Sequence, residues 1–557
     1  MGATEGTQAS AAIRQEKAAQ RQTQTLHDYR EAGSSTGKRA ESLTTVGPSN
    51  KHFSPLALIG LCYCILNSWT AASASLSISL VSGGPSVILW GLVVSFVGAM
   101  SVAVSMAEIC HVYPTTGGQY HWSFALAPSK YRYAIAYFTG WISAAGWVAL
   151  TATASSLAGQ FVVGIIGLMH EDYESQPWHI FLVYLGFAVT ACIINVFAVR
   201  LLDPINRFAL FWSLVGAAVI MITCLGRASP KYQTGEFVFT TFVNETGWNN
   251  GVAWILGLLQ STFSLIGADG ATHLVDEIDR PAISAPRTMV LAVVIGASST
   301  FVVLMVFLFV LQDFTGVVES TSGALLEIIY QATRNKAAAV CLIMFPLCSM
   351  MFTNVALLTT SSRMTQAFAR DKGMPFSGLL ERIDREVPIP SLILTTVWTI
   401  IFGCIYLGSS SALNAILSSS VVLLQLSYII PVALLLVRGR KVLDDANGGE
   451  KRKFNLGAFG PAINVFAILF VCLTDVFFLF PPDLPTTTTN MNYTVVVVGI
   501  VAFLAITAWF VQGRKHFKGP LDMDEILFRT RGFGRFDREA QKRRYGGHRV
   551  TCYQSAM

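Results

Sequence analysis

The sequence predicts an all-α polytopic membrane protein with twelve transmembrane helices. Twelve long stretches between about Phe53 and about Val511 are almost entirely apolar, and few charged residues interrupt them. A helix needs about 20 apolar residues to cross a hydrocarbon core about 30 Å thick. Only helices and closed barrels satisfy every backbone hydrogen bond in that core. Because the apolar runs are continuous and do not alternate with polar residues, they exclude a barrel.

Composition supports one membrane domain with two tails. Hydrophobic residues make up 53% of the chain and charged residues only 13%, whereas soluble domains carry about 25% charged residues. We expect a disordered cytoplasmic tail over 1–52, a twelve-helix domain over 53–513 and a cytoplasmic tail over 514–557. The expected spans are 55–80, 87–110, 134–161, 178–199, 208–226, 252–275, 288–311, 337–360, 391–408, 412–437, 459–480 and 494–512.

The distribution of charge predicts the orientation. Lysine and arginine concentrate in the short loops on the cytoplasmic side of membrane proteins. An opposite loop, 170–177, is acidic, and an even number of spans places both tails on one side, so both termini are expected to be cytoplasmic. The net charge of +6 then reflects topology and not a nucleic-acid partner. The basic loops are 111–133, 200–207, 362–390 and 438–456.

Two N-x-[ST] sequons, at Asn244 and Asn492, fall in segments expected outside. Such sequons are acceptors for glycans on exposed segments of exported loops. Both are predicted as glycosylation sites, with Asn492 adjoining a span, and chance occurrence remains an alternative for each.

The first ten spans divide into two sets of five with opposite orientation. That division predicts a five-plus-five inverted repeat, the architecture of many secondary transporters, in which interrupted helices at matching positions form the binding site. The corresponding members of the two sets are the first and sixth spans, and both contain helix-weakening residues.

In the first span, Asn67, Ser68, Trp69 and Thr70 lie near mid-membrane. Polar side chains at that depth are costly unless they pack against protein or line a cavity. They also compete for backbone hydrogen bonds and weaken a helix locally. We predict a broken helix at a substrate site, with hydroxyl-mediated contact between helices as the alternative.

In the sixth span, Gly267 and Gly270 flank Asp269, and His273 follows four residues later, with Ser264 before them. Glycines permit unwinding, and an ionisable group inside a span is a functional candidate by default. We expect Gly267 and its neighbours to line the site. Asp269 is either a proton or cation site or a buried structural cap.

Trp141 and Trp147 in the third span are candidates for a different contact. Tryptophan rings can enclose a quaternary ammonium group by cation–π attraction. The alternative is that they anchor the helix at the lipid interface or pack in the core.

The chain lacks the motifs of energy-coupled or catalytic proteins. It contains no Walker A motif, no G-x-S-x-G and no H-E-x-x-H, and no cysteine or histidine spacing typical of a metal site. We therefore expect neither an ATP-driven pump nor an enzyme, and no cofactor or metal.

Several blocks resemble the amino acid/choline transporter family of the amino acid–polyamine–organocation superfamily. The segment 108–120 resembles the family's E-x-x-x-x-Y-P-T-x-G-G-Q-Y motif, and further matches lie at 362–375, 267–277, 427–431 and 514–520. The resemblance implies substrate binding between the broken first and sixth helices, at Asn67, Ser68, Trp69, Thr70, Ser264, Ile266 and Gly267. It also implies a cytoplasmic gate formed by Tyr113, Pro114, Thr115, Gly117 and Gly118.

Two departures from the superfamily pattern affect what can be transferred. The first span has Asn-Ser-Trp-Thr where superfamily amino-acid carriers usually have G-x-G, so the usual binding of an α-carboxylate by backbone groups is in doubt. The fifth span, 208–226, contains no lysine to replace a sodium ion.

The expected function is uptake of a small amine or amino acid, choline-like or γ-aminobutyrate-like, by proton symport at the plasma membrane. Asp269 and His273 are the expected titrating groups, because histidine changes charge near neutral pH. Trp69 with Trp141 favours a choline-like cation. A vacuolar location, other amino acids or polyamines as substrates, a channel and a non-transporting nutrient receptor are the alternatives. The expected partners are the solute, protons and the lipid bilayer.

Overall fold

The computed structural model describes residues 55–520, apart from 171, 385, 408–411, 448–451 and 489. The predicted tail over 1–52 and most of the tail over 514–557 lie outside the described residues. The disorder expected of the N-terminal tail therefore stays a prediction.

The described chain contains twelve helices long and apolar enough to cross a membrane, which confirms the predicted class. The first five spans contain α2 (Pro55–Leu66), α3 (Ser68–Ala74) and α4 (Leu76–Val81); α5 (Gly84–Ser86), η1 (Val87–Gly91) and α6 (Leu92–Val112); α8 (Arg132–Met169); α9 (Pro177–Phe197); and η2 (Val199–Leu201) with α10 (Leu202–Ala228). The next five contain α12 (Asn250–Phe263) and η3 (Ala268–Glu277); α13 (Pro281–Val310); α16 (Lys336–Arg370); α18 (Ile389–Gly403) and η4 (Cys404–Leu407); and α19 (Ala412–Arg438). The last two contain η5 (Gly457–Phe459) and α21 (Gly460–Phe477), and α22 (Thr494–Ala508), η6 (Trp509–Gly513) and α23 (Arg514–His516).

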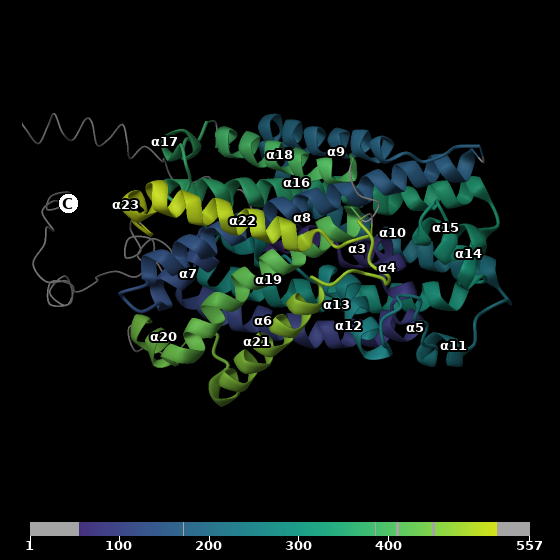
Figure 1. Ribbon diagram of the computed structural model, residues 1–557, viewed down its shortest axis with the longest axis horizontal. Coiled ribbons are helices and arrows are strands. Elements are labelled where there is room, and N and C mark those ends of the chain that lie inside the picture. Colours follow the sequence, from purple (N-terminus) through teal and green to yellow (C-terminus); the bar gives the residue numbers. More distant parts are fainter. Residues whose placement is uncertain are drawn as a thin grey trace, which may run out of the picture. The chain divides into compact units, whose positions relative to one another are not determined.

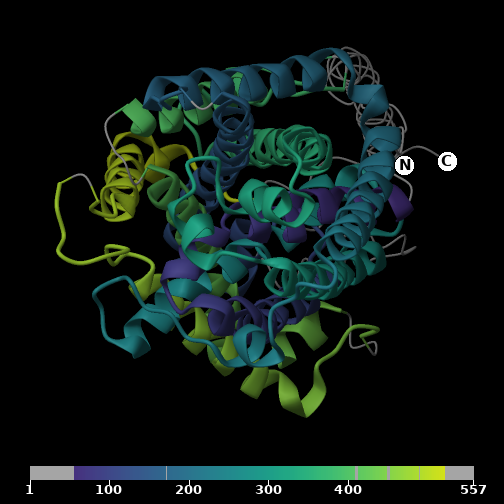
Figure 2. The ribbon, with the colours of Figure 1, turned by 90° about the vertical axis from the view of Figure 1, so that its right-hand side faces the viewer.

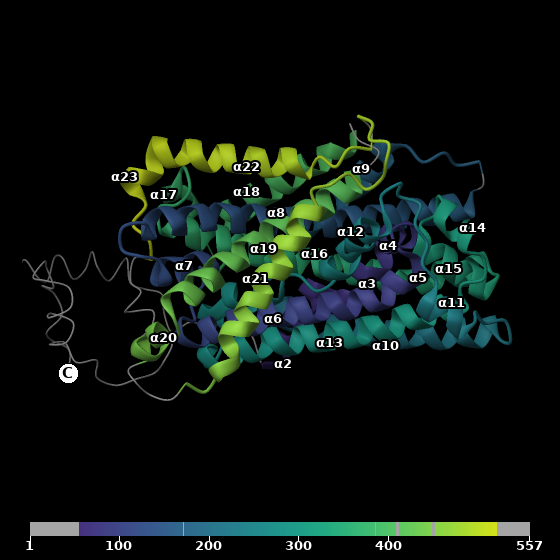
Figure 3. The same ribbon diagram turned by 60° about the horizontal axis from the view of Figure 1, so that its bottom comes forward.

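Short helices in the loops mark the two ends of the bundle. Helices α7 (Gln119–Leu126), α17 (Ser377–Leu380) and α20 (Lys441–Ala446) lie at one end with α23, and α11 (Gly235–Thr240), α14 (Phe314–Glu319) and α15 (Ala324–Thr333) lie at the other with α5 (Figures 1 and 3). The first group belongs to the loops predicted to be cytoplasmic and the second to the loops predicted to be outside. The alternation of loops between the two ends is therefore as expected.

The centre of the bundle is built on the two longest helices. Helix α8 packs against both α16 and α19, while α2 packs against α10, α13 and α16. In the most apolar 18-residue stretch of α9, only 22% of the residues are buried, and the last span has the same buried fraction. These two helices therefore face the surroundings of the bundle. Figure 2 views the bundle end-on, with α9 and α10 in blue along its rim. Lipid-facing helices remain apolar on their outer side because the surrounding solvent is itself apolar.

The first and sixth spans are interrupted where the sequence predicts. Helix α2 ends at Leu66 and α3 begins at Ser68, because Asn67 between them is left-handed with φ 41°. Helix α12 ends at Phe263, and the chain continues after Gly267, at φ 93°, as the 3₁₀ segment η3. Asparagine and glycine are the residues that adopt this backbone region at least cost.

The eighth span is longer than predicted. We expected a helix over 337–360 and a loop from 362, whereas α16 continues to Arg370. The polar residues from Thr359 to Arg363 continue the helix and are buried against protein. The Arg363 guanidinium forms an ion pair with Glu277 at the end of η3, so tertiary contacts satisfy the polar groups that the sequence alone leaves exposed.

Close packing of α2 on α10 gives a prediction for stability. A methyl group at Gly60 would lie 2.5 Å from the Asn206 carbonyl oxygen, which is backbone and cannot move aside. We expect Gly60→Ala to lower the free energy of unfolding by about 1–3 kcal/mol through overpacking. The matched control is Gly499→Ala in α22, where nothing lies within 4 Å of the new methyl group. Thermal unfolding in detergent checks both variants, and equal midpoints would contradict the close approach.

Candidate functional site

The two broken helices meet at their breaks. The side chain of Ile65, near the end of α2, lies against both glycines of the sixth span. A methyl group at Gly267 would come within 2.8 Å of Ile65 Cγ2, and one at Gly270 within 2.4 Å of Ile65 Cδ1. The glycines therefore serve two purposes at once, because they allow the unwound backbone and they admit the neighbouring helix.

A small cavity of about 10 Å³ lies at this junction, room for about one water molecule. The lining residues that belong to α8 are three, four or seven positions apart, and so are those that belong to α16, so each helix contributes one face. This volume is too small for a solute molecule, so the conformation described is closed around the site. The lining residues are Ile65, Leu66, Asn67, Ala71, Leu150, Ala154, Leu157, Phe263, Ile266, Met350, Thr353 and Leu357.

Two of the predicted substrate residues, Asn67 and Ile266, line this cavity. The Asn67 amide nitrogen lies 3.8 Å from the Met350 sulfur, a weak contact that leaves the amide available to a ligand. Ser68 and Thr70 are buried nearby, and their hydroxyl groups have no hydrogen-bond partner among the described residues. Buried polar groups are normally paired, so these two hydroxyls support the prediction of a polar site at the start of α3.

Other polar groups at the breaks have structural partners. The Ser264 hydroxyl donates to the Ser261 carbonyl oxygen, 2.8 Å away. The Thr353 hydroxyl of α16 donates to the Cys64 carbonyl oxygen near the end of α2, also at 2.8 Å. The second contact ties the eighth span to the end of a broken helix, and no pattern in the sequence indicated it.

The structure separates the two tryptophans that were expected to act together. The Trp69 indole N–H donates to the Ser213 hydroxyl of α10 at 2.8 Å, and Trp141 lines a different cavity. Trp147 instead approaches the break, since its ring lies 5.4 Å from the His273 ring in an edge-to-face arrangement. From the sequence, Trp141 and Trp147 were both candidates and we expected Trp141 at the site, whereas Trp147 is the ring that lies beside the break.

Asp269 is fully buried and receives three contacts from three parts of the chain. The Tyr428 hydroxyl of α19 donates to one carboxylate oxygen at 2.5 Å. The Gln119 amide donates to the other at 2.5 Å, and His273 Nε2 lies 3.3 Å from that same oxygen. A buried carboxylate without such partners would cost several kcal/mol, so these groups fix the position of the sixth span.

The two partners of His273 constrain where its ring carries hydrogen. Its Nδ1 lies 2.9 Å from the Thr116 carbonyl oxygen, which can only accept, so Nδ1 carries a hydrogen. In a neutral ring Nε2 would then be an acceptor facing a carboxylate, which is also an acceptor. The contact between Nε2 and Asp269 is favourable only when a proton lies on one of them.

The predicted cytoplasmic gate packs directly on this pair. The Thr116 hydroxyl donates to an Asp276 carboxylate oxygen at 2.6 Å. Gly118 has a left-handed backbone, with φ 53°, and lies close to His273. A methyl group at this position would lie 3.1 Å from His273 Cε1, so a larger residue would crowd the histidine ring. Gln119 and Thr116 thus connect the gate to Asp269 and His273, although about 150 residues separate them along the chain.

A second buried carboxylate fastens α7 to the end of α16. Asp371 accepts hydrogen bonds from the Tyr120 hydroxyl at 2.9 Å and from His121 Nε2 at 2.7 Å. Burial raises the pKa of the Tyr120 hydroxyl well above its usual value, and the Asp371 charge adds to this. Tyr120 therefore stays protonated and donates at all physiological pH values.

A third buried carboxylate, Glu108, lies at the same end of the bundle. It faces Arg440 Nε at 3.0 Å and Arg452 Nη1 at 2.9 Å, and it accepts a bond from the Leu456 backbone N–H at 3.2 Å. Arg452 also reaches Asp444 at 2.7 Å. The loop between α19 and α21 is thereby held against the end of α6, immediately before the gate.

The two sequons differ in accessibility. Asn492 is buried, with its amide nitrogen donating to the Phe478 and Phe480 carbonyl oxygens, which argues against it as a glycan acceptor. Asn244 is partly exposed, although its amide nitrogen donates to the Trp248 carbonyl oxygen at 2.8 Å. Glycosylation at Asn244 stays a prediction.

Twelve membrane-spanning helices, two of them broken at one polar site, define a helical multi-pass carrier of the inverted-repeat type. The chain belongs to the amino acid permease family, whose profile matches residues 53–503.

Three relatives illustrate the range of the family. A choline transporter of Saccharomyces cerevisiae is 35% identical over 476 residues, which cover 84% of this chain and 82% of the relative. A putative amino acid/polyamine transporter of Macrophomina phaseolina is 32% identical over 78% of this chain and 96% of its own length. An amino-acid permease of Arabidopsis thaliana is 28% identical over 82% of this chain and 91% of its own. All three are transporters or permeases and not enzymes.

The Glu108 cluster gives a prediction for the loop that it holds. Removing one partner of a buried ion pair leaves uncompensated charge and costs about 3–5 kcal/mol. We therefore expect Glu108→Ala to lower the free energy of unfolding by about that amount, because Arg440 and Arg452 lose their common partner. Denaturation in detergent micelles measures the change.

The matched control is the surface pair Asp203 and Arg207, on successive turns of α10, in which Arg207 is exposed and Asp203 half-buried. Exposed pairs contribute about 0–1 kcal/mol, so Asp203→Ala should have little effect. Equal losses for Glu108→Ala and Asp203→Ala would show that Glu108 does not hold the loop.

Proposed function

We propose that the protein is a secondary active transporter that takes up a small nitrogenous solute together with a proton. The observation on which this rests is the Asp269–His273 pair, buried beside the two broken helices and in contact with the gate. Family membership supplies the transport class, while the direction and the coupling ion are the proposal. Both termini are proposed to be cytoplasmic, because the basic loops gather at the end that holds α7, α17 and α20. The plasma membrane is proposed as the location, with the vacuolar membrane as the alternative.

The proton would act on the gate through hydrogen bonds. When the pair holds its proton, Nε2 and the Asp269 oxygen attract each other, and the Thr116 carbonyl oxygen keeps its bond from Nδ1. When the proton leaves, two acceptors face each other at 3.3 Å and repel. That change reaches Thr116 and Gln119 directly, so proton release and movement of the gate would be coupled as alternating access requires.

Helix ends at the cavity favour a positively charged amine. Helix α2, with 12 residues, and α12, with 14 residues, both end at the break, and a helix C-terminus carries about half a negative charge. Among the described residues that line the cavity, none is charged. A cationic headgroup could therefore be held by carbonyl groups and the Asn67 amide. The similarity to a choline transporter supports a choline-like substrate, and γ-aminobutyrate, other amino acids and polyamines remain candidates.

Uptake by cells that lack their own carriers tests the function. Labelled choline, γ-aminobutyrate, a neutral amino acid and a polyamine would be supplied with and without a protonophore, with surface protein measured in parallel. We expect choline uptake to saturate, to show counterflow and to collapse with the protonophore. Saturable uptake that resists the protonophore would overturn proton coupling, and non-saturating flux without counterflow would indicate a channel.

Asp269 and a matched carboxylate give a prediction for coupling. Asp269→Asn removes the proton-sharing partner of His273, so we expect substrate-driven proton influx to fall at least tenfold while counterflow is retained. The control is Asp475→Asn in α21, since Asp475 is also buried within a span but has no hydrogen-bond partner among the described residues. Proton influx in proteoliposomes measures both, and unchanged coupling in Asp269→Asn would exclude that residue.

Asn67 allows conformation and binding to be separated. Asn67→Gly keeps the left-handed backbone and removes the amide, whereas Asn67→Ala removes the amide and strains the backbone. If the amide binds substrate, both variants should raise KM about tenfold, the equivalent of one hydrogen bond. If Asn67 only shapes the break, Asn67→Gly should transport normally and Asn67→Ala should not. Initial uptake rates against concentration distinguish the two outcomes.

A further inference from the structure

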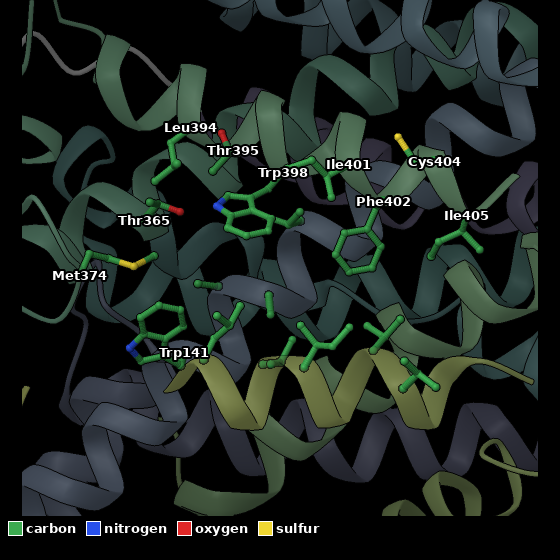
Figure 4. Close-up of a pocket in the computed structure, with 18 of the residues that line it drawn as sticks. Trp141, Thr365, Met374, Leu394, Thr395, Trp398, Ile401, Phe402, Cys404 and Ile405 are labelled. Carbon is green, nitrogen blue, oxygen red and sulfur yellow. The ribbon is translucent and has the colours of Figure 1, made fainter. Parts of the chain in front are cut away.

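A second and much larger cavity of about 540 Å³ lies between α8, α16, α18 and α22. It shares no lining residue with the cavity at the helix breaks. Figure 4 shows it as a groove, with Trp141, Thr365 and Met374 at one end and Cys404 and Ile405 at the other. Its volume falls in the range of sites for small ligands, about 300–1,000 Å³.

The groove opens toward the surroundings of the bundle. Of its lining residues, Trp398 and Ile401 of α18 and Val496 and Ile500 of α22 are all exposed. Only 39% of the apolar window of the ninth span and 22% of that of the twelfth are buried. In a membrane this face contacts lipid, so the available occupant is a lipid molecule.

One polar group at one end of the groove is buried without a partner. The Thr365 hydroxyl has no hydrogen bond within the described residues, whereas the Trp141 indole N–H has the Tyr137 hydroxyl of the same helix as a neighbour. At the other end, the Tyr493 hydroxyl donates to the Thr488 carbonyl oxygen and the Cys404 thiol donates to the Ile400 carbonyl oxygen. Among these groups, the unmet hydrogen-bonding capacity therefore lies at the Thr365 end. An unpaired buried donor costs about 1–3 kcal/mol, so a ligand that pairs with it there would be favoured.

That end is the one proposed to face the cytoplasm. Thr365 lies five residues before the end of α16 at Arg370, and Met374 belongs to the loop that follows. On α22 the groove extends from Tyr493 to Leu504, eleven residues or about 16 Å of helix. The groove therefore runs along the membrane normal for about half the hydrocarbon thickness.

The lining selects the chemistry of the occupant. None of the described residues that line the groove is charged, so a phosphate or ammonium headgroup would have no partner there. Ala144 and Ala145 give α8 a flat surface, and the rings of Trp398 and Phe402 project from α18. A flat, rigid and apolar body fits between such walls with little loss of conformational entropy.

We propose that this groove is a binding site for a membrane sterol. The sterol hydroxyl, which both donates and accepts, would pair with Thr365 Oγ1. The ring system would lie on Ala144 and Ala145, with the tail directed toward Ile405. Helices α8 and α16 also line the substrate cavity through Leu150 and Leu357, so sterol occupancy would bear on the same two helices that must separate for transport.

Photolabelling of the full-length protein in phosphatidylcholine nanodiscs tests the proposal. The probe is a diazirine analogue of ergosterol, displaced by unlabelled ergosterol. We expect saturable labelling that maps to α18 and α22. Thr365→Val keeps the shape and removes the hydroxyl, so it should weaken displacement about 3- to 10-fold, the effect of one hydrogen bond. Ala145→Phe fills the groove and should abolish saturable labelling.

The matched control is Val215→Phe on the exposed face of α10, which adds a ring away from the groove and should leave labelling unchanged. Equal displacement by a phospholipid acyl chain would overturn the sterol as occupant. Loss of a dimer in Ala145→Phe, seen by native mass spectrometry, would instead identify a second copy of the chain. Labelling that does not saturate, or that Thr365→Val leaves unaltered, would also overturn the proposal. None of these results depends on which solute is transported.

Discussion

The arrangement of the bundle depends on the need to satisfy one carboxylate, Asp269, in its interior. Burying a carboxylate there is costly unless hydrogen bonds replace water. Tyr428 from the tenth span and Gln119 from the segment after the second span provide them, and His273 adds a titratable neighbour. These bonds hold three distant segments at one point. Since that point adjoins the breaks in the first and sixth spans, the same contacts position the substrate cavity.

The breaks and the gate form one mechanical unit. Ile65 of the first span packs on the glycines of the sixth, and the sixth span presents His273 to the Thr116 carbonyl oxygen of the gate. Under the proposed mechanism, opening the cavity would disturb the gate, and a proton placed on the Asp269–His273 pair would alter the contact between them. Glu108 and Asp371 secure the surrounding segments through buried charge-assisted bonds. Strong, directional contacts of this kind favour two discrete arrangements over gradual deformation.

The two cavities lie on opposite sides of α8. The inner one is small and enclosed by the broken helices, and the outer one is an apolar groove on the face formed by α18 and α22. Helices α8 and α16 stand between them and contribute to both. A molecule held in the outer groove would press on the same helices that close the inner site. Under the proposal of a sterol site, the lipid environment would act on transport through these two helices.

The sequence by itself determined the class, the number of spans, the two breaks and the buried pair of Asp269 and His273. These follow from local rules, because membrane thickness sets helix length and the backbone must satisfy its own hydrogen bonds in hydrocarbon. Only the tertiary structure decided which side chains meet. It joined Tyr428 to Asp269, and it placed Trp147 beside the break and Trp141 in the groove. A helix that is apolar all round carries no periodic signal of its rotation, so the contacts across the bundle fix which face turns inward.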